Sequence, residues 1–146
     1  MSGSKNRSAY IRVPRYQPGK ENATRIELRS PDPGCNIYLT FAVMLAAGLE
    51  GIRENFPLPP AVEENIYHMS NARQKKFSIL TLPRNLEEAV KLAEKSTLVR
   101  ETLGEHSFTK FIANKREEIA DYVKTVGSEF DKQVSDYEIG RYLPFL

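Results

Sequence analysis

The chain has 146 residues, of which 40% are hydrophobic and 27% are charged, so it is about one domain long with enough apolar residues for a core. This composition excludes a disordered chain, and a formal net charge of +2 is too small to indicate a nucleic-acid-binding protein. Residues 1–30 hold seven Lys or Arg against two Glu, whereas the rest of the chain holds more acids than bases. That uneven distribution predicts a local anion-binding site.

Cysteine content and hydropathy indicate the compartment. A single cysteine, Cys35, excludes an internal disulfide and fits a reducing environment. The polar N-terminus lacks the apolar segment of a signal peptide. The most apolar run, residues 37–49, is shorter than the roughly 20 residues that cross a bilayer. We therefore expect a cytoplasmic protein with no membrane partner.

Two stretches near the N-terminus are predicted strands. Residues 8–15 (SAYIRVPR) and 24–30 (TRIELRS) alternate apolar and polar side chains, as half-buried strands do. Pro18 and Gly19 supply turn chemistry in the loop between them. The simplest arrangement is an antiparallel pair.

The next segment is predicted to be a buried helix. Asn36 is a suitable N-cap for a helix from Ile37 to about Asn55. The residues of this helix are apolar almost all round, which is typical of a helix without a solvent-facing side. Residues 61–83 are predicted to form a short helix within an ordered excursion.

Helix-start signals organise the C-terminal part. Asn85 with Glu88, and Ser135 with Glu138, have the spacing of capping boxes. The helices predicted here run from 85 to about 95, from 96 to 104, from about 108 to 130, and from 135 into the C-terminal YLPFL.

The predicted fold class is therefore α+β, with an antiparallel strand pair followed by a buried helix and several C-terminal helices. Residues 1–35 carry the strands and residues 36–146 are mainly helical. An isolated strand pair is marginally stable in water, and a helix that is apolar all round needs cover on every side. We therefore expect the chain to be part of something larger.

The outward face of the second strand carries alternating charges. Residues two apart in a strand share a face, so Arg25, Glu27 and Arg29 form a row that Arg12 of the first strand can lie beside. One interpretation is an exposed face with cross-strand ion pairs. The other is a polyanion site, in which guanidinium groups bind phosphate or carboxylate oxygens and the carboxylate binds a divalent cation. The residue pattern leaves both open.

Several longer motifs resemble the glutamine synthetase family, in order and at plausible spacing. They are NRSAYIRVP, TRIELRSPDPGCNIYLTFAVMLAAGLEGI, EENIYHMS, LGEHSFTKFIANKREE and YEIGRYL. The resemblance is to the prokaryotic type, runs through residues 1–146 as a single segment, and corresponds to about the last third of such an enzyme. It implies a partial catalytic domain whose parent enzyme joins ammonia to L-glutamate through a γ-glutamyl phosphate formed from ATP.

The resemblance also implies roles for individual residues. Arg7 matches an arginine that contacts the transferring phosphoryl group and so has a catalytic, ATP-binding role. Arg12 matches an arginine that holds ATP phosphates, Glu27 a divalent-metal ligand, and Arg29 a binder of the substrate glutamate. Lys20 matches an ATP-binding lysine, in a loop that is longer here than in the family.

Other positions are open or depart from the family pattern. Arg25 either lies near the nucleotide or only pairs with Glu27. Tyr67 matches a tyrosine that one branch of the family adenylylates, but an ordinary surface or interface tyrosine is the preferred interpretation. The family has Pro where Ile37 stands, and often Trp where Ile119 and Tyr137 stand, which bears on packing.

The implied ligands are Mg²⁺ or Mn²⁺ as cofactor and ATP, L-glutamate and ammonia as substrates. The implied partners are the remaining part of the enzyme and neighbouring subunits of a homo-oligomeric ring. Because further metal carboxylates lie upstream in the family, the chain alone is predicted to be inactive. The alternative is a non-catalytic binding or interaction module, or a subunit of a split enzyme.

Overall fold

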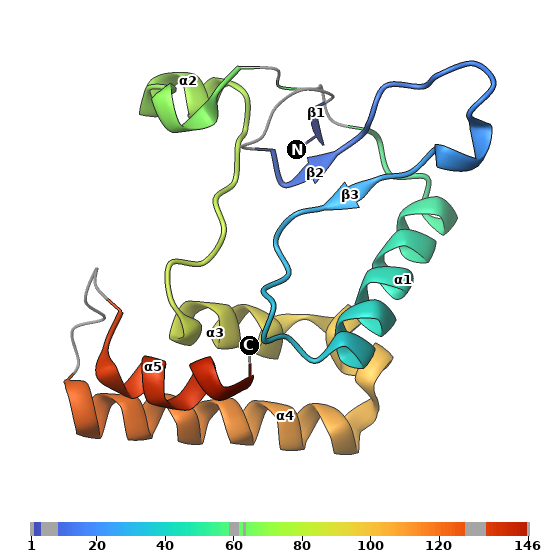
Figure 1. Cartoon of the computed structure of the whole chain (residues 1–146). Coiled ribbons are helices and arrows are strands. Elements are labelled where there is room, and N and C mark those ends of the chain that lie inside the picture. Colours follow the sequence, from blue (N-terminus) through green and yellow to red (C-terminus); the bar gives the residue numbers. More distant parts are fainter. Residues whose placement is uncertain (1, 4–8, 59–61, 63, 128–133, 146) are drawn as a thin grey trace. The chain divides into compact units, whose positions relative to one another are not determined.

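The computed structural model describes residues 2–3, 9–58, 62, 64–127 and 134–145, which are mostly helical with a small sheet (Figure 1). The chain divides into two compact units. Unit 1 comprises Met1–Asp32 and Phe56–Thr81, and unit 2 comprises Pro33–Asn55 and Leu82–Leu146. The elements in chain order are β1 (Ser2–Gly3), β2 (Ile11–Arg12), η1 (Glu21–Ala23), β3 (Glu27–Leu28), α1 (Ile37–Arg53), η2 (Ile66–His68), α2 (Asn71–Lys76), α3 (Leu86–Lys95), α4 (Thr97–Val126), α5 (Asp136–Tyr142) and η3 (Leu143–Phe145).

The sheet of unit 1 contains the predicted antiparallel pair. β2 pairs with β3 so that Ile11 lies opposite Leu28 and Arg12 opposite Glu27. The ladders are only two residues long, shorter than the predicted strands, and β1 adds a parallel strand beside β2 that the sequence did not indicate. The apolar face of the pair has little cover, since Ile26 is 69% exposed. A longer ladder would therefore gain little stability from the burial of its side chains.

Residues 64–81 of unit 1 contain a short helix, as predicted between residues 61 and 83, and a 3₁₀ turn before it. The 3₁₀ turn η2 is followed by α2, whose N-cap Ser70 accepts a hydrogen bond from the amide of Arg73. Val62 and Met69 are buried here, as is Ala9 next to β2. These are the buried apolar residues among those described in unit 1.

Helix α1 of unit 2 begins where the sequence predicted, but it is not the buried helix that was expected. The Asn36 side chain accepts hydrogen bonds from the amides of Tyr38 and Leu39, both at 3.1 Å. Yet none of the residues of α1, all of which are described, is buried. The helix packs on α4, and among the described residues this packing buries none of its side chains below the surface. No helix in the described ranges is both long and apolar enough to cross a membrane.

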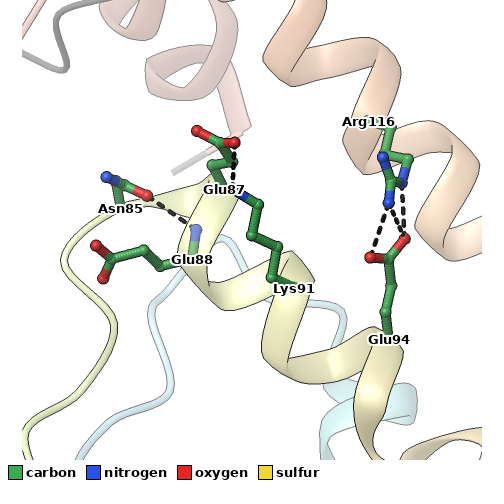
Figure 2. A network of polar contacts seen from close by, with 6 residues as sticks. All are labelled: Asn85, Glu87, Glu88, Lys91, Glu94 and Arg116. Carbon is green, nitrogen blue, oxygen red and sulfur yellow. Dashed lines mark hydrogen bonds and ion pairs between the residues drawn. The ribbon is translucent and has the colours of Figure 1, made fainter.

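Helix α3 begins at the predicted cap with one difference. The amide of Glu88 donates to Asn85 Oδ1 at 2.9 Å, as in a capping box (Figure 2). The Glu88 carboxylate, however, accepts from the amide of Arg84 and not from that of Asn85. The helix start is thus confirmed, with its reciprocal bond moved one residue upstream.

Helix α4 contains the predicted break at Gly104. This residue has φ 72° and ψ 154°, which interrupts the helical backbone and separates a short first piece from a long second piece. The second piece ends at Val126, followed by Gly127 in a positive-φ conformation. The last residues of the helix predicted to reach about residue 130 lie outside the described ranges.

The core of unit 2 lies between α3 and α4. Val90, Phe108 and Ile112 are buried together there, and half-buried apolar residues of both helices surround them. At the rim, Arg116 of α4 donates two hydrogen bonds to the carboxylate of Glu94 of α3, at 2.7 and 2.8 Å (Figure 2). The predicted amphipathic long helix thus turns Phe108 and Ile112 into the core, whereas Val123 and Val126 further along are exposed.

Helix α5 packs on the second half of α4. Its N-terminus carries the predicted capping box, in which the Glu138 amide donates to Ser135 Oγ and the Ser135 amide donates to the Glu138 carboxylate. The rings of Tyr137 and Tyr122 meet edge to face, with centroids 5.6 Å apart.

Candidate functional site

The register of β2 and β3 builds a cluster of two arginines around one carboxylate. Arg12 Nη1 of β2 donates a hydrogen bond to Glu27 Oε2 of β3 at 2.8 Å. Arg25, two residues before Glu27, approaches the other oxygen, with Nη2 2.8 Å and Nε 3.1 Å from Oε1. The prediction that Arg12 lies beside the charged row is confirmed. The pairing of Arg25 with Glu27, which the sequence left open, is present in the structure.

These contacts favour the ionised form of the Glu27 carboxyl. The hydrogen bond from Arg12, its charge, and the weaker contribution of Arg25 lower the pKa of Glu27 below its ordinary value, while partial burial acts in the opposite direction. The Glu27 side chain is 30% exposed and its two partners are more so. Exposed pairs of this kind stabilise a fold weakly, so the cluster is better suited to holding charge in one place than to holding the strands together.

Arg29 lies at the end of the same charged row. It follows Glu27 by two residues, which places it on the same side of the extended backbone. Its amide donates to the carbonyl of Tyr10 at 3.0 Å, and this bond continues the β2–β3 pairing past the ladder. The structure thus positions the backbone of Arg29 next to the cluster. Arg7, predicted to contact the phosphoryl group, lies outside the described residues.

Lys20 lies in the loop between the two strands and not in the cluster. It immediately precedes the 3₁₀ turn η1 and is exposed. Glu21 fixes this loop, because its Oε1 accepts hydrogen bonds from the Gly19 amide and the Tyr16 hydroxyl, both at 2.9 Å. Backbone hydrogen bonds, then the Tyr16 hydroxyl, lower the pKa of Glu21. Lys20 is therefore carried on an ordered turn, a feature that the Pro-Gly turn signal did not reveal.

The described residues do not form a complete divalent-metal site. Both oxygens of Glu27 accept hydrogen bonds from guanidinium groups. Within the ranges that the structure describes, no group of three or more His, Cys, Asp or Glu is close enough to hold a metal. A magnesium ion usually takes one or two protein carboxylates together with phosphate oxygens and water. Glu27 alone matches one such ligand, and the others would have to come from outside these residues.

A hollow with charged residues at its edge lies between α3 and α4 and was not expected from the sequence. It has a volume of about 360 Å³ and a floor of Phe108 and Ile112. The Arg100 guanidinium lies 4.2 Å from the centroid of the Phe108 ring and pairs with Glu105. Because Arg116 is likewise paired with Glu94, both cations at this hollow already have carboxylate partners.

Comparison with known proteins assigns the chain to a family. The family model for the glutamine synthetase catalytic domain matches residues 2–142. The chain is 43% identical over 141 residues to a glutamine synthetase of Mycobacterium tuberculosis strain H37Rv, covering 97% of this chain and 30% of the relative. It is 46% identical over 138 residues to that of Thermotoga maritima, covering 94% and 29%. The glutamine synthetase of Methanocaldococcus jannaschii is 43% identical over 140 residues, covering 96% and 28%.

The matches cover very different shares of this chain and of its relatives. Nearly all of this chain is matched, yet the chain spans only about 30% of the length of the curated relatives. The match to the family model covers both the strands with the Arg12–Glu27 cluster and the helical unit 2. The chain therefore belongs to the glutamine synthetase family.

Proposed function

We propose that the chain is the C-terminal part of a glutamine synthetase catalytic domain and contributes one side of its active site. That enzyme would phosphorylate the γ-carboxylate of L-glutamate with ATP, after which ammonia would displace the phosphate. The observation that supports this proposal is the Glu27 carboxylate between Arg12 and Arg25 across paired strands, in a chain that belongs to this family. Phosphoryl transfer is catalysed mainly by positioning and charge stabilisation, which fixed cations supply.

In this proposal each charged residue has one role. Arg12 holds ATP phosphates and Arg29 holds the substrate glutamate, since guanidinium forks bind phosphate and carboxylate oxygens through two parallel hydrogen bonds. Arg7 contacts the transferring phosphoryl group, and Lys20 reaches ATP from the loop before η1. Glu27 is one ligand of Mg²⁺ or Mn²⁺, and the remaining ligands come from the part of the enzyme that this chain lacks.

The chain alone is proposed to be inactive. The described cluster contains one carboxylate, that of Glu27, and so supplies at most one metal ligand. The match covers 30% of the relative, so about 70% of the relative's length lies outside the matched part. The test is to supply the purified chain with glutamate, ammonia, ATP and Mg²⁺ or Mn²⁺ and to measure glutamine. No product is expected, while the full-length Thermotoga maritima relative serves as the positive control. Turnover by the chain alone would contradict this proposal.

The proposed roles are tested in a reconstituted enzyme. The chain is co-expressed with the upstream part of the Thermotoga maritima relative, and glutamine formation is compared for wild type, Arg12→Lys and Glu27→Gln. Each substitution is expected to lower kcat about a hundredfold or more, since each removes a charged contact to the reacting groups. Arg53→Lys, at the end of α1, is the matched control and is expected to leave kcat unchanged. Full activity of Glu27→Gln would refute its role.

The second candidate is a non-catalytic interaction module or a subunit of a split enzyme. The exposed apolar residues of α1 favour an interaction partner. Glutamine synthesis restored by a separate upstream chain would support the split enzyme, and association without synthesis would support the module. In either case we propose a cytoplasmic location, and in the enzyme a homo-oligomeric ring, which size-exclusion chromatography with light scattering of the reconstituted complex tests.

A further inference from the structure

Helix α1 has two different sides. At 100° per residue, its half-buried apolar positions Leu39, Val43 and Ala46 fall on one side, and α1 packs against α4. The large apolar side chains that remain exposed gather on the opposite side, within an arc of roughly 140°. This open stripe consists of Ile37, Tyr38, Phe41, Met44, Leu45, Leu49 and Ile52.

The open stripe is unusually apolar for a protein surface. Tyr38 and Ile52 are 80% and 79% exposed, and Phe41 and Leu45 are 65% and 64% exposed. The charged residues of α1, Glu50 and Arg53, fall outside the arc. A contiguous surface of this kind marks an interface. An interface without charged residues resembles a domain core cut in half, which is typical of permanent contacts.

The length of the relatives indicates which polypeptide covers the open stripe. This chain supplies about 30% of a glutamine synthetase, so most of the polypeptide that accompanies α1 in the relatives lies outside this sequence. The sheet that precedes α1 is equally incomplete, because its two-residue ladders are shorter than a stable sheet requires. A second copy of this chain is the competing occupant, and a homodimer would reveal it.

We propose that the open stripe of α1 is the docking surface for the upstream part of a glutamine synthetase catalytic domain. This inference rests on the proposed function, and it names the surface through which the two parts join. Docking buries the stripe against the incoming part and leaves α1 between that part and α4, so α1 becomes the internal helix that its composition requires. Association through α1 and catalysis through Glu27 are then separable properties of one chain.

The test uses the whole chain with an affinity tag, co-expressed with the upstream part of the Thermotoga maritima relative, ended just before the matched residues. We expect the wild-type chain to recover the upstream part. The variant Phe41→Ser/Leu45→Ser is expected to weaken association about a hundredfold, because two large apolar side chains leave the interface. The matched control is Leu58→Ser/Leu80→Ser, which removes side chains of unit 1 that are 85% and 91% exposed and is expected to bind like wild type.

Three outcomes would overturn the inference. They are no recovery of the upstream part by the wild-type chain, equal recovery by the Phe41→Ser/Leu45→Ser variant, and a homodimer that this variant dissociates but the upstream part does not. Circular dichroism of each variant establishes that its helices are intact. Glu27→Gln separates the two proposals: it is expected to associate like wild type and to be inactive. Association without any activity of the wild-type complex would refute the proposed function and leave the docking surface standing.

Discussion

Glu27 shows how two neighbouring cations set the charge of an acid that remains partly exposed. Arg12 contacts it from the facing strand β2, and Arg25 from two residues before it in the chain. Because the folded-state pKa of Glu27 lies below that of the unfolded chain, its ion pairs stabilise the fold above the ordinary pKa of the carboxyl. This stabilisation is lost as the pH falls through the lowered folded-state value.

The first prediction concerns this pKa. Arg12→Ala removes the largest cause of the shift and is expected to raise the pKa of Glu27 toward its ordinary value of 4.5. Carbon-13 NMR titration of the Glu27 carboxyl measures it directly. Arg53→Ala, outside the sheet, is the control and should leave the titration unchanged. A wild-type titration midpoint at or above 4.5 would contradict the ion-pair geometry.

The second prediction concerns Tyr137, whose buried hydroxyl has no hydrogen-bond partner among the described residues. A buried polar group without a partner costs free energy, so Tyr137→Phe is expected to leave stability unchanged or to raise it by up to about 1 kcal/mol. Tyr137→Ala also removes the ring that meets Tyr122 and should cost about 3 kcal/mol. Urea denaturation measures both, and a clear loss of stability in Tyr137→Phe would reveal a partner for the hydroxyl.

At this scale the sequence predicted much of the cluster. Alternation in residues 24–30 placed Glu27 on one face, and the strand pairing brought Arg12 beside it. It left open whether Arg25 pairs with Glu27, because a side chain two residues away along a strand reaches its neighbour only in certain rotamers. The role of Glu27 as a metal ligand stays a prediction.

Among the elements, α4 depends on one residue with an unusual backbone. Gly104 combines positive φ with extended ψ, a conformation that is open almost only to glycine. The break it makes turns the first part of α4 away from the second, and Arg100 spans it by stacking on Phe108 and pairing with Glu105.

The third prediction follows from this conformation. Gly104→Ala is expected to destabilise unit 2 by about 1–3 kcal/mol through backbone strain alone, because the added Cβ meets no atom within 4 Å apart from its chain neighbours and the adjacent helical backbone. Gly140→Ala, in α5 and equally unobstructed, is the matched control and should stabilise by about 0.5–1 kcal/mol. The measurement is the free energy of unfolding in urea. Equal effects of both substitutions would contradict the assigned conformation.

Local sequence signals predicted where the helices begin better than they predicted how deeply the helices are buried. The caps at Asn36, Asn85 and Ser135 each accept the expected hydrogen bond, since capping depends on residues three positions apart. The burial of α1 was predicted wrongly because burial depends on what packs outside the helix. Its composition is that of a buried helix, yet the described residues leave every position of it at least partly exposed.

The whole chain consists of two units with separate buried residues. Unit 2 has a core at Val90, Phe108 and Ile112, whereas Ala9, Val62 and Met69 are buried in unit 1. The sequence predicted a strand region and a helical region. It did not predict that residues 56–81 belong to the same unit as the strands. Such an assignment depends on long-range contacts that leave no periodic pattern.

The fourth prediction tests the independence of the two units. Phe108→Ala empties the core between α3 and α4 and is expected to destabilise unit 2 by about 3–5 kcal/mol. Hydrogen exchange should then accelerate in α3 and α4 and stay unchanged at the Arg29 amide, which donates to Tyr10 in unit 1. Phe41→Ala, at an exposed position, is the control. Equal acceleration in both units would show that they unfold as one.

The interleaving of the two units also has a consequence for synthesis on the ribosome. The strands β2 and β3 are translated before residues 56–81, which belong to the same unit, and α1 lies between them in the sequence. Because translation proceeds from the N-terminus, α1 emerges well before α4 is finished at Val126. Throughout that interval α4 is not yet available to pack on this apolar segment, and a chaperone that shields such segments is expected to bind there first.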